Sequence, residues 1–482
     1  MNRRMVFYVV GRIALAAALL LLLPALVSLI YRESCGWSFL ITVGISLAVG
    51  AVLTLLSHPR SQVIYAREGF AIVALGWLLT SLLGALPFVL SGEVPSFIDA
   101  FFETVSGLTT TGASILTDVE ALSHGLLFWR SLTIWIGGMG VLIFIMALIP
   151  NIADRSIHIV RAEMPGPVVG KLVPRVKDTA KILYIIYIAM TLLEVAFLLF
   201  GGMPLFESIN HALSNAGTGG FGVKADSMTG YSPYLQWVIT VFMLLFGVNF
   251  NLYYLIIIRR ARTALRSSEL WCYLGIVALS STVIMFNILP QFGSVGEALR
   301  HSVFQVAAII TTTGFATADF TLWPDLSKGI LFVLLFIGGC AGSTAGGLKL
   351  SRAMMLVKTV GREFKRLLHP RSVSAVRFEG KPVDESTLSS VSTYFAVYMI
   401  CIMAVFLLIC AEPFGFETNF SAAVTCFNNV GPGLGMVGPA GGFSAYSGFS
   451  KLVLSFAMLL GRLEVFPLIL ALSPGSWIKK QN

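Results

Sequence analysis

Long apolar runs separated by short polar segments extend along nearly the whole chain. The first two, residues 13–30 and 37–57, are each close to the roughly 20 residues that a helix needs to cross a bilayer. Arginines precede the first run, as in a signal peptide, but the run is long and no small-residue cleavage site follows it. We therefore expect residues 1–60 to form two transmembrane helices that remain in the protein.

Beyond residue 60 the pattern repeats four times. Each unit has a long apolar helix, a shorter half-apolar helix, a glycine-containing loop and a second long apolar helix. The loops are TTTGAS (109–114), GTGGFG (217–222), TTTGFAT (311–317) and NNVGPG (428–433). An internal repeat is stronger evidence about a fold than any short motif. It predicts four units at residues 61–155, 156–262, 263–368 and 369–482, and ten transmembrane helices in all.

The short helices carry polar residues one turn apart. Counted back from each loop glycine, positions −13 and −9 hold Asp99 and Glu103, Glu207 and His211, His301 and Gln305, and Thr418 and Ala422. Residues four apart share a helix face. Because polar groups inside a membrane usually pair with one another, we interpret this stripe as hydrogen bonds that brace the repeats. Direct contact with a transported ion is the alternative.

Composition supports an all-α polytopic membrane protein. The chain is 56% hydrophobic and 12% charged, whereas soluble domains carry about 25% charged residues. Most lysines and arginines lie in segments that face inward if the N-terminus is cytoplasmic, which places both termini inside and the glycine loops outside. This distribution of the net charge of +9 argues against nucleic acid as a partner. The six cysteines form no C-x-x-C pair, so they predict neither a disulfide framework nor a zinc site.

Two glycine motifs imitate nucleotide-binding sites. Gly217, Gly219 and Gly222 have G-x-G-x-x-G spacing, but they follow a half-apolar helix where the fingerprint needs a strand. The segment GGCAGSTAGGLK (338–349) has Leu348 where a phosphate loop needs lysine. The chain itself is therefore expected to bind no nucleotide. The histidines form no H-E-x-x-H motif or similar cluster, and no enzymatic activity is expected.

Glycine and threonine in the four loops suit a filter for small cations. Backbone carbonyls can replace the water around an ion, glycine permits the necessary dihedral angles, and threonine hydroxyls add oxygen ligands. The candidate filter residues are Thr110, Thr111, Gly112, Thr218, Gly219, Gly220, Thr312, Thr313, Gly314, Asn429, Val430 and Gly431. Acids follow three of the loops: Asp118, Glu120, Asp226, Asp319 and Asp325. They either raise the local cation concentration or belong to ordinary solvated loops.

A run of glycines interrupts the apolar helix that starts near Lys328. Because five glycines lie within ten residues, we favour an unwound stretch lining the ion pathway over close helix packing. Arg462 lies within another apolar run, and an arginine inside a bilayer is a functional hypothesis by default; a salt bridge with Glu464 or another acid is the alternative. We expect the glycine run, Arg462 and Asn251 to meet beneath the filter. The candidate gating residues are Gly338, Gly339, Gly342, Ser343, Thr344, Gly346, Gly347 and Arg462.

The segments TTTGFAT, AGTGGFG, GGCAGSTAGG and GRLEVF, with the two extra N-terminal helices, resemble the superfamily of Trk, Ktr and HKT potassium transporters. The resemblance is greatest to the TrkH-type membrane subunit. It implies potassium uptake through a pseudo-fourfold pore in the bacterial inner membrane, with Gly338–Gly347 as the gating loop and Arg462 facing the pore. Val430 departs from the expected hydroxyl residue, so the fourth loop is expected to coordinate the ion less well. A sodium- or ammonium-permeable transporter of the same architecture is the alternative.

The resemblance also implies partners. The family works as a homodimer on a cytoplasmic ring of TrkA-like nucleotide-binding regulatory subunits, so nucleotide is expected on the partner and no cofactor on this chain, with K⁺ as the transported ion at Thr111, Gly112, Gly219, Gly220, Thr313, Gly314, Val430 and Gly431. The basic clusters Arg155–Lys181 and Lys349–Lys381 are the expected docking surface, although attraction to anionic lipid accounts for part of their charge.

Overall fold

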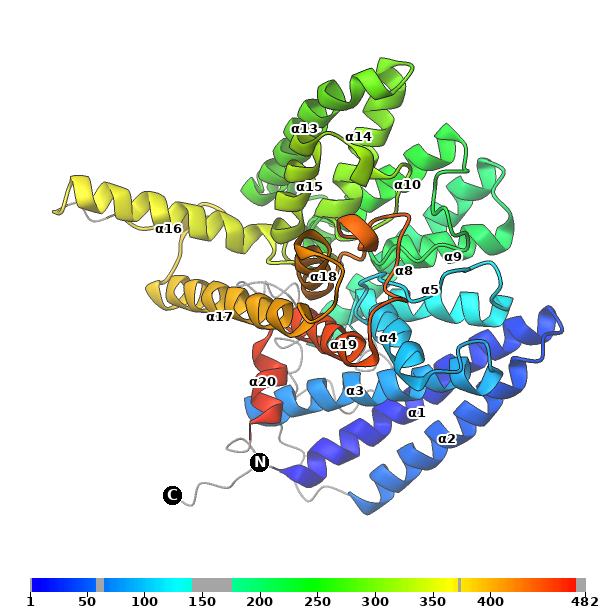
Figure 1. The fold of residues 1–482 in the computed structure, drawn as a ribbon. Helices are drawn as coiled ribbons and strands as arrows, with labels where there is room; N and C mark the ends of the chain where they lie inside the picture. The colour runs from blue at the N-terminus through cyan, green and yellow to red at the C-terminus, as the bar shows by residue number, and fades with distance from the viewer. Residues whose placement is uncertain (1, 58–64, 141–175, 372–373, 474–482) are drawn as a thin grey trace.

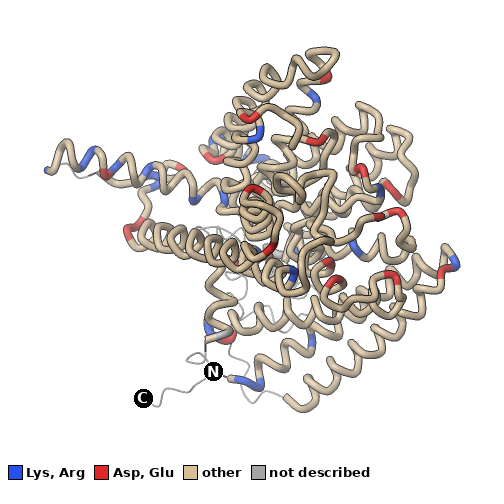
Figure 2. Tube along the Cα trace, viewed as in Figure 1, with Lys and Arg blue, Asp and Glu red and all other residues tan. Residues whose placement is uncertain are grey.

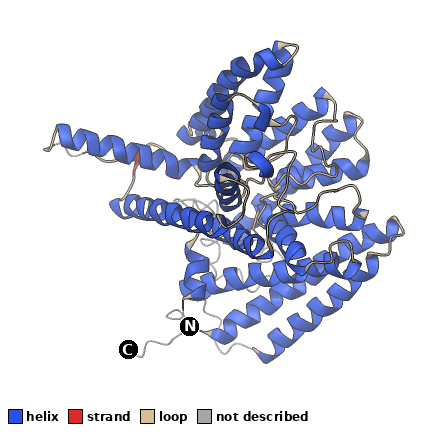
Figure 3. Ribbon diagram, viewed as in Figure 1, coloured by secondary structure: helices blue, strands red, loops and turns tan. Residues whose placement is uncertain are grey.

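The structure, a computed structural model, describes residues 2–57, 65–140, 176–371 and 374–473 and is almost entirely helical there (Figures 1 and 3). The strands in this part of the chain are β1 (Arg377–Phe378) and β2 (Lys381–Pro382), which form a short antiparallel hairpin. The N-terminal pair, α1 (Arg3–Ile30) and α2 (Gly36–Leu56), packs together beside α3, as the two apolar runs predict.

Each of the four units contains the predicted succession of long helix, short helix, loop and second helix. The elements of the first two units are α3 (Ala66–Ser91), α4 (Phe97–Leu108) and α5 (His124–Gly138), then α8 (Val176–Phe200), α9 (Leu205–Ala216), α10 (Pro233–Phe246), α11 (Phe250–Ile257) and α12 (Ala261–Ala264). The elements of the last two are α13 (Ser268–Ile288), α14 (Val295–Ile310), α15 (Asp325–Ile337) and α16 (Leu350–Leu368), then α17 (Glu385–Ile409), α18 (Phe416–Asn428), α19 (Gly448–Arg462) and α20 (Phe466–Leu472). Short 3₁₀ turns lie at Leu289–Gln291, Phe320–Leu322 and Gly435–Val437.

The packing of the units follows a cycle. The second helix of each unit contacts the short helix of the next: α5 packs on α9, α10 on α14, α15 on α18, and α19 returns to α4. The four units therefore close into a ring, in keeping with the predicted fourfold arrangement. All four short helices end at the glycine loops, so the negative ends of their dipoles lie beside these loops.

The second helix of each unit differs from the sequence prediction of one long apolar helix. Helices α5, α10, α15 and α19 contain 15, 14, 13 and 15 residues, too few to span a bilayer alone. Helices α10 and α11 meet at 90°, because Asn249 starts a new helix by accepting a hydrogen bond from the Asn251 N–H at 2.9 Å. In the described residues, six helices are long and apolar enough to span a membrane, or seven with this bent pair.

Candidate functional site

The four glycine loops share one backbone conformation. The residue two positions before each loop glycine has a φ between 55° and 57°; these residues are Thr110, Thr218, Thr312 and Asn429. The loop glycines themselves have positive φ angles of 78°, 69°, 83° and 98° at Gly112, Gly220, Gly314 and Gly431. A β-branched residue in the left-handed region is strained and persists only where its surroundings hold it. The surrounding protein therefore holds the four loops in a conformation that an isolated peptide of the same sequence would not adopt.

The loops meet in a closed ring that we call the filter ring. A Cβ atom built on each loop glycine would lie within 3.0 Å of the carbonyl oxygen that precedes the glycine of the next loop. Gly112 faces the oxygen of Gly219, Gly220 that of Thr313, Gly314 that of Val430, and Gly431 that of Thr111. The structure thus brings together eight candidate filter residues, one glycine and one carbonyl from each repeat. Only glycine fits at four of these positions.

The threonine side chains are hydrogen-bonded within the loops. The hydroxyls of Thr109 and Thr111 lie 2.8 Å apart, and those of Thr311 and Thr313 lie 2.7 Å apart. Asn429 donates from Nδ2 to the Thr111 hydroxyl at 3.0 Å and so joins the fourth loop to the first. The loop backbone, more than the hydroxyls that the sequence suggested as ligands, therefore faces the neighbouring loops.

A cavity of about 460 Å³ opens above the ring, and all four loop glycines line it. The basic residues Arg130 and Lys224 lie on its wall. The five acids that follow the loops are not among its lining residues. Asp319 instead accepts a hydrogen bond from the Thr321 N–H, and Asp325 pairs with Lys328 at 2.9 Å. The geometry therefore favours ordinary loop roles for these acids over a cation-attracting mouth.

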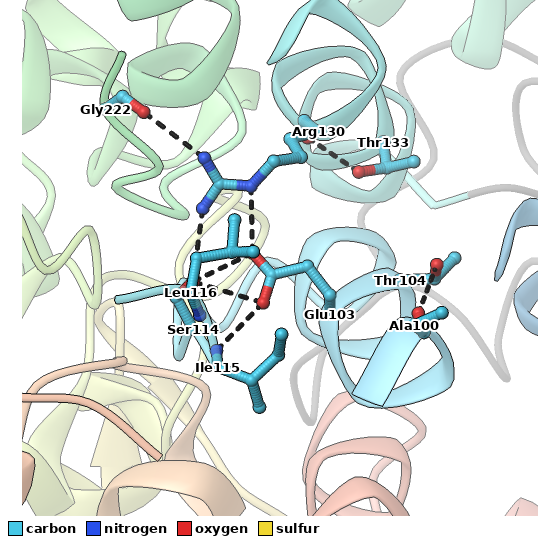
Figure 4. Close-up of polar contacts among 9 residues, drawn as sticks. All are labelled: Ala100, Glu103, Thr104, Ser114, Ile115, Leu116, Arg130, Thr133 and Gly222. Carbon is cyan, nitrogen blue, oxygen red and sulfur yellow. Dashed lines mark hydrogen bonds and ion pairs between the residues drawn. The ribbon is translucent and has the colours of Figure 1, made fainter. Parts of the chain in front are cut away.

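The polar stripe on the short helices is engaged by protein groups. Glu103 forms a buried ion pair with Arg130 at 2.8 Å and accepts hydrogen bonds from the Ser114 hydroxyl and the Ile115 N–H, each at 3.0 Å (Figure 4). Arg130 in turn donates to the carbonyl oxygen of Gly222 at 3.4 Å in the second loop (Figure 4). In each repeat we call the segment that leads from the glycine loop to the second helix the return loop. These contacts fix the return loop of the first repeat above the ring and tie it to the second glycine loop.

The same stripe braces the other units. Glu207 accepts a hydrogen bond from the Tyr231 hydroxyl at 2.6 Å, and His301 lies 2.8 Å from the Thr317 hydroxyl. Asp99 forms an ion pair with Lys451 of the fourth repeat at 2.6 Å. These contacts agree with the interpretation as bracing. Most of them join a short helix to its own return loop, whereas the sequence suggested contacts between repeats.

The glycine-rich loop, residues 338–347, is unwound and lies directly beneath the filter ring. The φ angles of Gly338, Gly342 and Gly347 are 74°, 73° and 74°. The Gly346 N–H donates to the Thr312 hydroxyl at 2.6 Å, so the loop touches the third filter segment.

Other members of the loop contact the break between α10 and α11. The carbonyl of Gly342 accepts from the Phe250 N–H at 3.1 Å, and the Thr344 hydroxyl donates to the Phe246 carbonyl at 3.3 Å. Two further members bond locally: the Ser343 hydroxyl donates to the Cys340 carbonyl, and the Gly339 carbonyl accepts from the Leu350 N–H.

Arg462 joins the glycine-rich loop to the first repeat. Its guanidinium donates to the carbonyl oxygens of Thr344 at 2.9 Å, Gly137 at 2.6 Å and Gly138 at 2.8 Å. Glu464, the acid that the sequence offered as its partner, pairs instead with Arg352 at 2.6 Å. A cavity of only about 50 Å³ remains among these groups. The space among these groups is thus nearly filled.

Three residues of this region were not predicted to belong to the site, and two of them, Lys349 and Arg352, were expected in the basic docking cluster but are buried. Asn249, and not Asn251, has its side chain beside Gly342. In the sequence Gly-Val-Asn at the α10–α11 break, Asn249 is the residue of a type that caps helices, and this was the signal that could have identified it. Lys349, at the end of the glycine run, is buried and donates to the Ala345 carbonyl. Arg352 is paired with a residue 112 positions away, and no local signal could reveal that contact.

Comparison with known proteins agrees with this geometry. The family model for TrkH, described as a cation transport protein, matches residues 36–290 and 270–478. The potassium uptake proteins TrkH of Salmonella typhimurium and Escherichia coli are 37% and 36% identical over 99% of this chain and their full length. The crystal structure of the potassium transporter TrkH from Vibrio parahaemolyticus superposes with a TM-score of 0.90 at 32% identity, covering 99% of this chain and all of that one. The chain is therefore a multi-pass membrane protein that belongs to the TrkH family of cation transport proteins.

Proposed function

We propose that this protein takes up K⁺ through the filter ring, in the bacterial inner membrane, with both termini in the cytoplasm. The observation that carries the proposal is the closed cycle of four glycines and four carbonyl oxygens. The relatives that it matches over their whole length are named potassium uptake proteins. The twelve filter residues proposed from the sequence keep that assignment, with Thr111, Gly219, Thr313 and Val430 supplying the central carbonyls. The four repeats keep their proposed boundaries.

Uncharged oxygens suit a pore better than carboxylates. Backbone carbonyls replace the waters of a monovalent cation, and their partial charges attract it without the strong binding that would prevent its release. The short helices add the negative ends of their dipoles at the same place. The braced return loops keep the ring at one diameter, so ions of different size are not bound equally well.

The glycine-rich loop and Arg462 act as the gate in this proposal. The loop fills the space under the ring, and Arg462 adds a positive charge in a region with little water. Two unit charges about 8 Å apart at an effective dielectric constant near 20 repel by roughly 2 kcal/mol, about thirtyfold in rate. Glycine tolerates the dihedral changes needed for the loop to move aside.

A cytoplasmic partner controls this gate in our proposal. Lysines and arginines are spaced along α16, the helix that follows the loop (Figure 2). A basic helix attached to the gate suits a ring of TrkA-like nucleotide-binding regulatory subunits, on which the protein would sit as a homodimer. Nucleotide would then bind the partner. Most of the second basic cluster, Arg155–Lys181, lies outside the described residues.

Flux through purified protein in liposomes tests the proposal. Wild-type protein is expected to take up rubidium, a potassium analogue, much faster than sodium, and rescue of a potassium-uptake-deficient bacterium at low potassium is the matching test in cells. A comparable flux of sodium or ammonium would instead support the alternative cation transporter.

The gate needs separate variants. Deletion of Gly342–Gly346 and the substitution Arg462→Ala are each expected to raise rubidium flux, by up to about thirtyfold for the loss of the charge. Arg462→Lys is the matched control because it retains the positive charge. Unchanged or lower flux in both the deletion and Arg462→Ala, with normal folding, would show that these groups do not limit conduction.

A further inference from the structure

Glu269 contacts the glycine-rich loop from outside the filter and gate residues discussed so far. It lies in the first turn of α13, at the start of the third repeat, with only 4% of its surface exposed. Its Oε1 accepts a hydrogen bond from the Ala341 N–H at 2.8 Å. The Ser351 N–H, just beyond the other end of the loop, also faces this carboxyl group. One side chain thus contacts the middle of the loop and the first turn of α16 that follows it.

This contact is strong for its size. A carboxylate that accepts from a backbone N–H makes a charge-assisted hydrogen bond, which is shorter and stronger than a neutral one. The loop has three glycines with positive φ and few regular backbone bonds of its own, so anchors outside it decide where it lies. Ala341 sits between Cys340 and Gly342, whose backbone groups contact the α10–α11 break. Glu269 therefore holds the same segment of the loop that is hydrogen-bonded to the second repeat.

A second glutamate fixes the position of Glu269. Oε1 of Glu379, in the β1–β2 hairpin, accepts hydrogen bonds from the Ser267 hydroxyl, the Ser268 hydroxyl and the Glu269 N–H. All three distances lie between 3.0 and 3.1 Å. The hairpin is tied to α16 as well, since Lys358 donates from Nζ to the Arg377 carbonyl at 2.9 Å. A continuous chain of contacts runs from α16 through the hairpin and Glu269 to the loop.

We propose that Glu269 is a positioning residue that latches the glycine-rich loop beneath the filter, and that Glu379 holds this latch at the start of α13. The proposal rests on the proposed role of the loop as a gate. A force on α16 or on the hairpin would release the loop through Glu269, at a distance from the filter ring.

The first test is rubidium flux in liposomes. Glu269→Ala removes the acceptor and is expected to raise flux about tenfold, the effect of losing one hydrogen bond to a charged group. Glu269→Gln keeps an oxygen that can accept from Ala341 but loses the charge, so its flux is expected to lie between those of wild type and Glu269→Ala. Glu297→Ala is the matched control. Glu297 also lies in the first turn of a helix of the third repeat, where its backbone N–H donates to the Ser294 hydroxyl, and the substitution to alanine keeps that N–H.

The second test follows the loop itself. Cys340 is buried in the loop, so its reaction rate with a small thiol reagent reports loop release in a chain whose other five cysteines are replaced by serine. Glu269→Ala is expected to increase this rate severalfold, Glu269→Gln by less, and Glu297→Ala not at all. Glu379→Ala is the milder second variant, expected to change rate and flux in the same direction, should Glu269→Ala not fold.

The outcomes separate the latch from the gate. If deletion of Gly342–Gly346 raises flux but Glu269→Ala changes neither flux nor Cys340 labelling, the latch is wrong and the gate stands. If neither the deletion nor Arg462→Ala raises flux, the gate itself is wrong. Faster labelling of Cys340 without higher flux would show that Glu269 positions the loop but does not control conduction, which also overturns the proposal.

Discussion

The filter ring makes a sharp prediction at Gly314. Substitution by serine places a Cβ atom against the Val430 carbonyl oxygen and 2.8 Å from Cδ of Pro432. Both neighbours belong to the fourth loop, whose backbone has no free space on that side. The Val430 carbonyl must therefore move out of the ring, and the variant Gly314→Ser is expected to lose discrimination between K⁺ and Na⁺.

The size of the effect follows from two contributions. A non-glycine residue at the φ of 83° costs about 1–2 kcal/mol of stability wherever it occurs. Relief of the clash also requires a carbonyl displacement on the order of 1 Å, beyond ordinary van der Waals adjustment. An interaction between a polar group and a full charge contributes about 1.5–3 kcal/mol. Loss of one such contact changes the preference for K⁺ about tenfold or more.

A second glycine separates strain from geometry. Gly202 has a φ of 82°, and a Cβ atom there would meet nothing within 4 Å. Gly202→Ser thus carries the same backbone cost without touching the ring. In liposomes, Gly314→Ser should lower the rubidium-to-sodium flux ratio about tenfold while Gly202→Ser leaves it unchanged. Equal ratios in both variants and wild type would refute the assignment of the ring as the filter.

Two further predictions concern the supports of the ring. Glu103→Gln should lower the free energy of unfolding by about 3–5 kcal/mol, because Arg130 stays buried without its charged partner; thermal unfolding in detergent measures this, and a loss below 1 kcal/mol would contradict it. Burial tends to raise the pKa of Glu33, but hydrogen bonds from the Gly125 and His124 N–H groups outweigh it and hold the pKa below 4.5. Glu33 therefore stabilises the fold above pH 4.5, and this stability is lost as the pH falls through its folded pKa. Glu33→Gln should reduce the difference in melting temperature between pH 6 and pH 4, and an unchanged difference would argue against the linkage.

The repeat and its loops could be predicted because their signals are local. A loop glycine is needed where φ is positive and a neighbouring backbone approaches, so Gly112, Gly220, Gly314 and Gly431 stand out in the sequence itself. The residues that start and end the short helices are likewise signalled by the sequence nearby. Ser294, for example, accepts from the Glu297 N–H and starts α14, and the loop follows directly after the sixteen residues of this helix. The unwound glycine run was predictable for the same reason.

The remaining features depend on contacts between distant residues. The sequence offered Glu464 to Arg462, two positions away, but the chain turns sharply at Glu464 and Val465, where φ is 55° and 66°. That turn carries the carboxylate to Arg352 and leaves Arg462 pointing at α5. Apolar composition likewise gave no sign that α10 ends at Phe246, since residues on both sides of the break are equally apolar.

The contacts of Arg462 show how a moving loop and a fixed ring could coexist in the proposed gate. Arg462 holds two carbonyls at the end of α5 and one in the glycine-rich loop. In the proposed opening, the bond to Thr344 is lost, while the bonds to Gly137 and Gly138 keep Arg462 at the wall of the pathway. In the proposal, opening removes the backbone that fills the space and frees one donor of the guanidinium for water, and the higher local dielectric constant weakens its repulsion of a passing ion. The Thr312 hydroxyl loses its bond from Gly346 in the same movement. The proposed opening is thus coupled to the third filter segment through this hydrogen bond and to the fourth through the packing of Gly346 against Asn429.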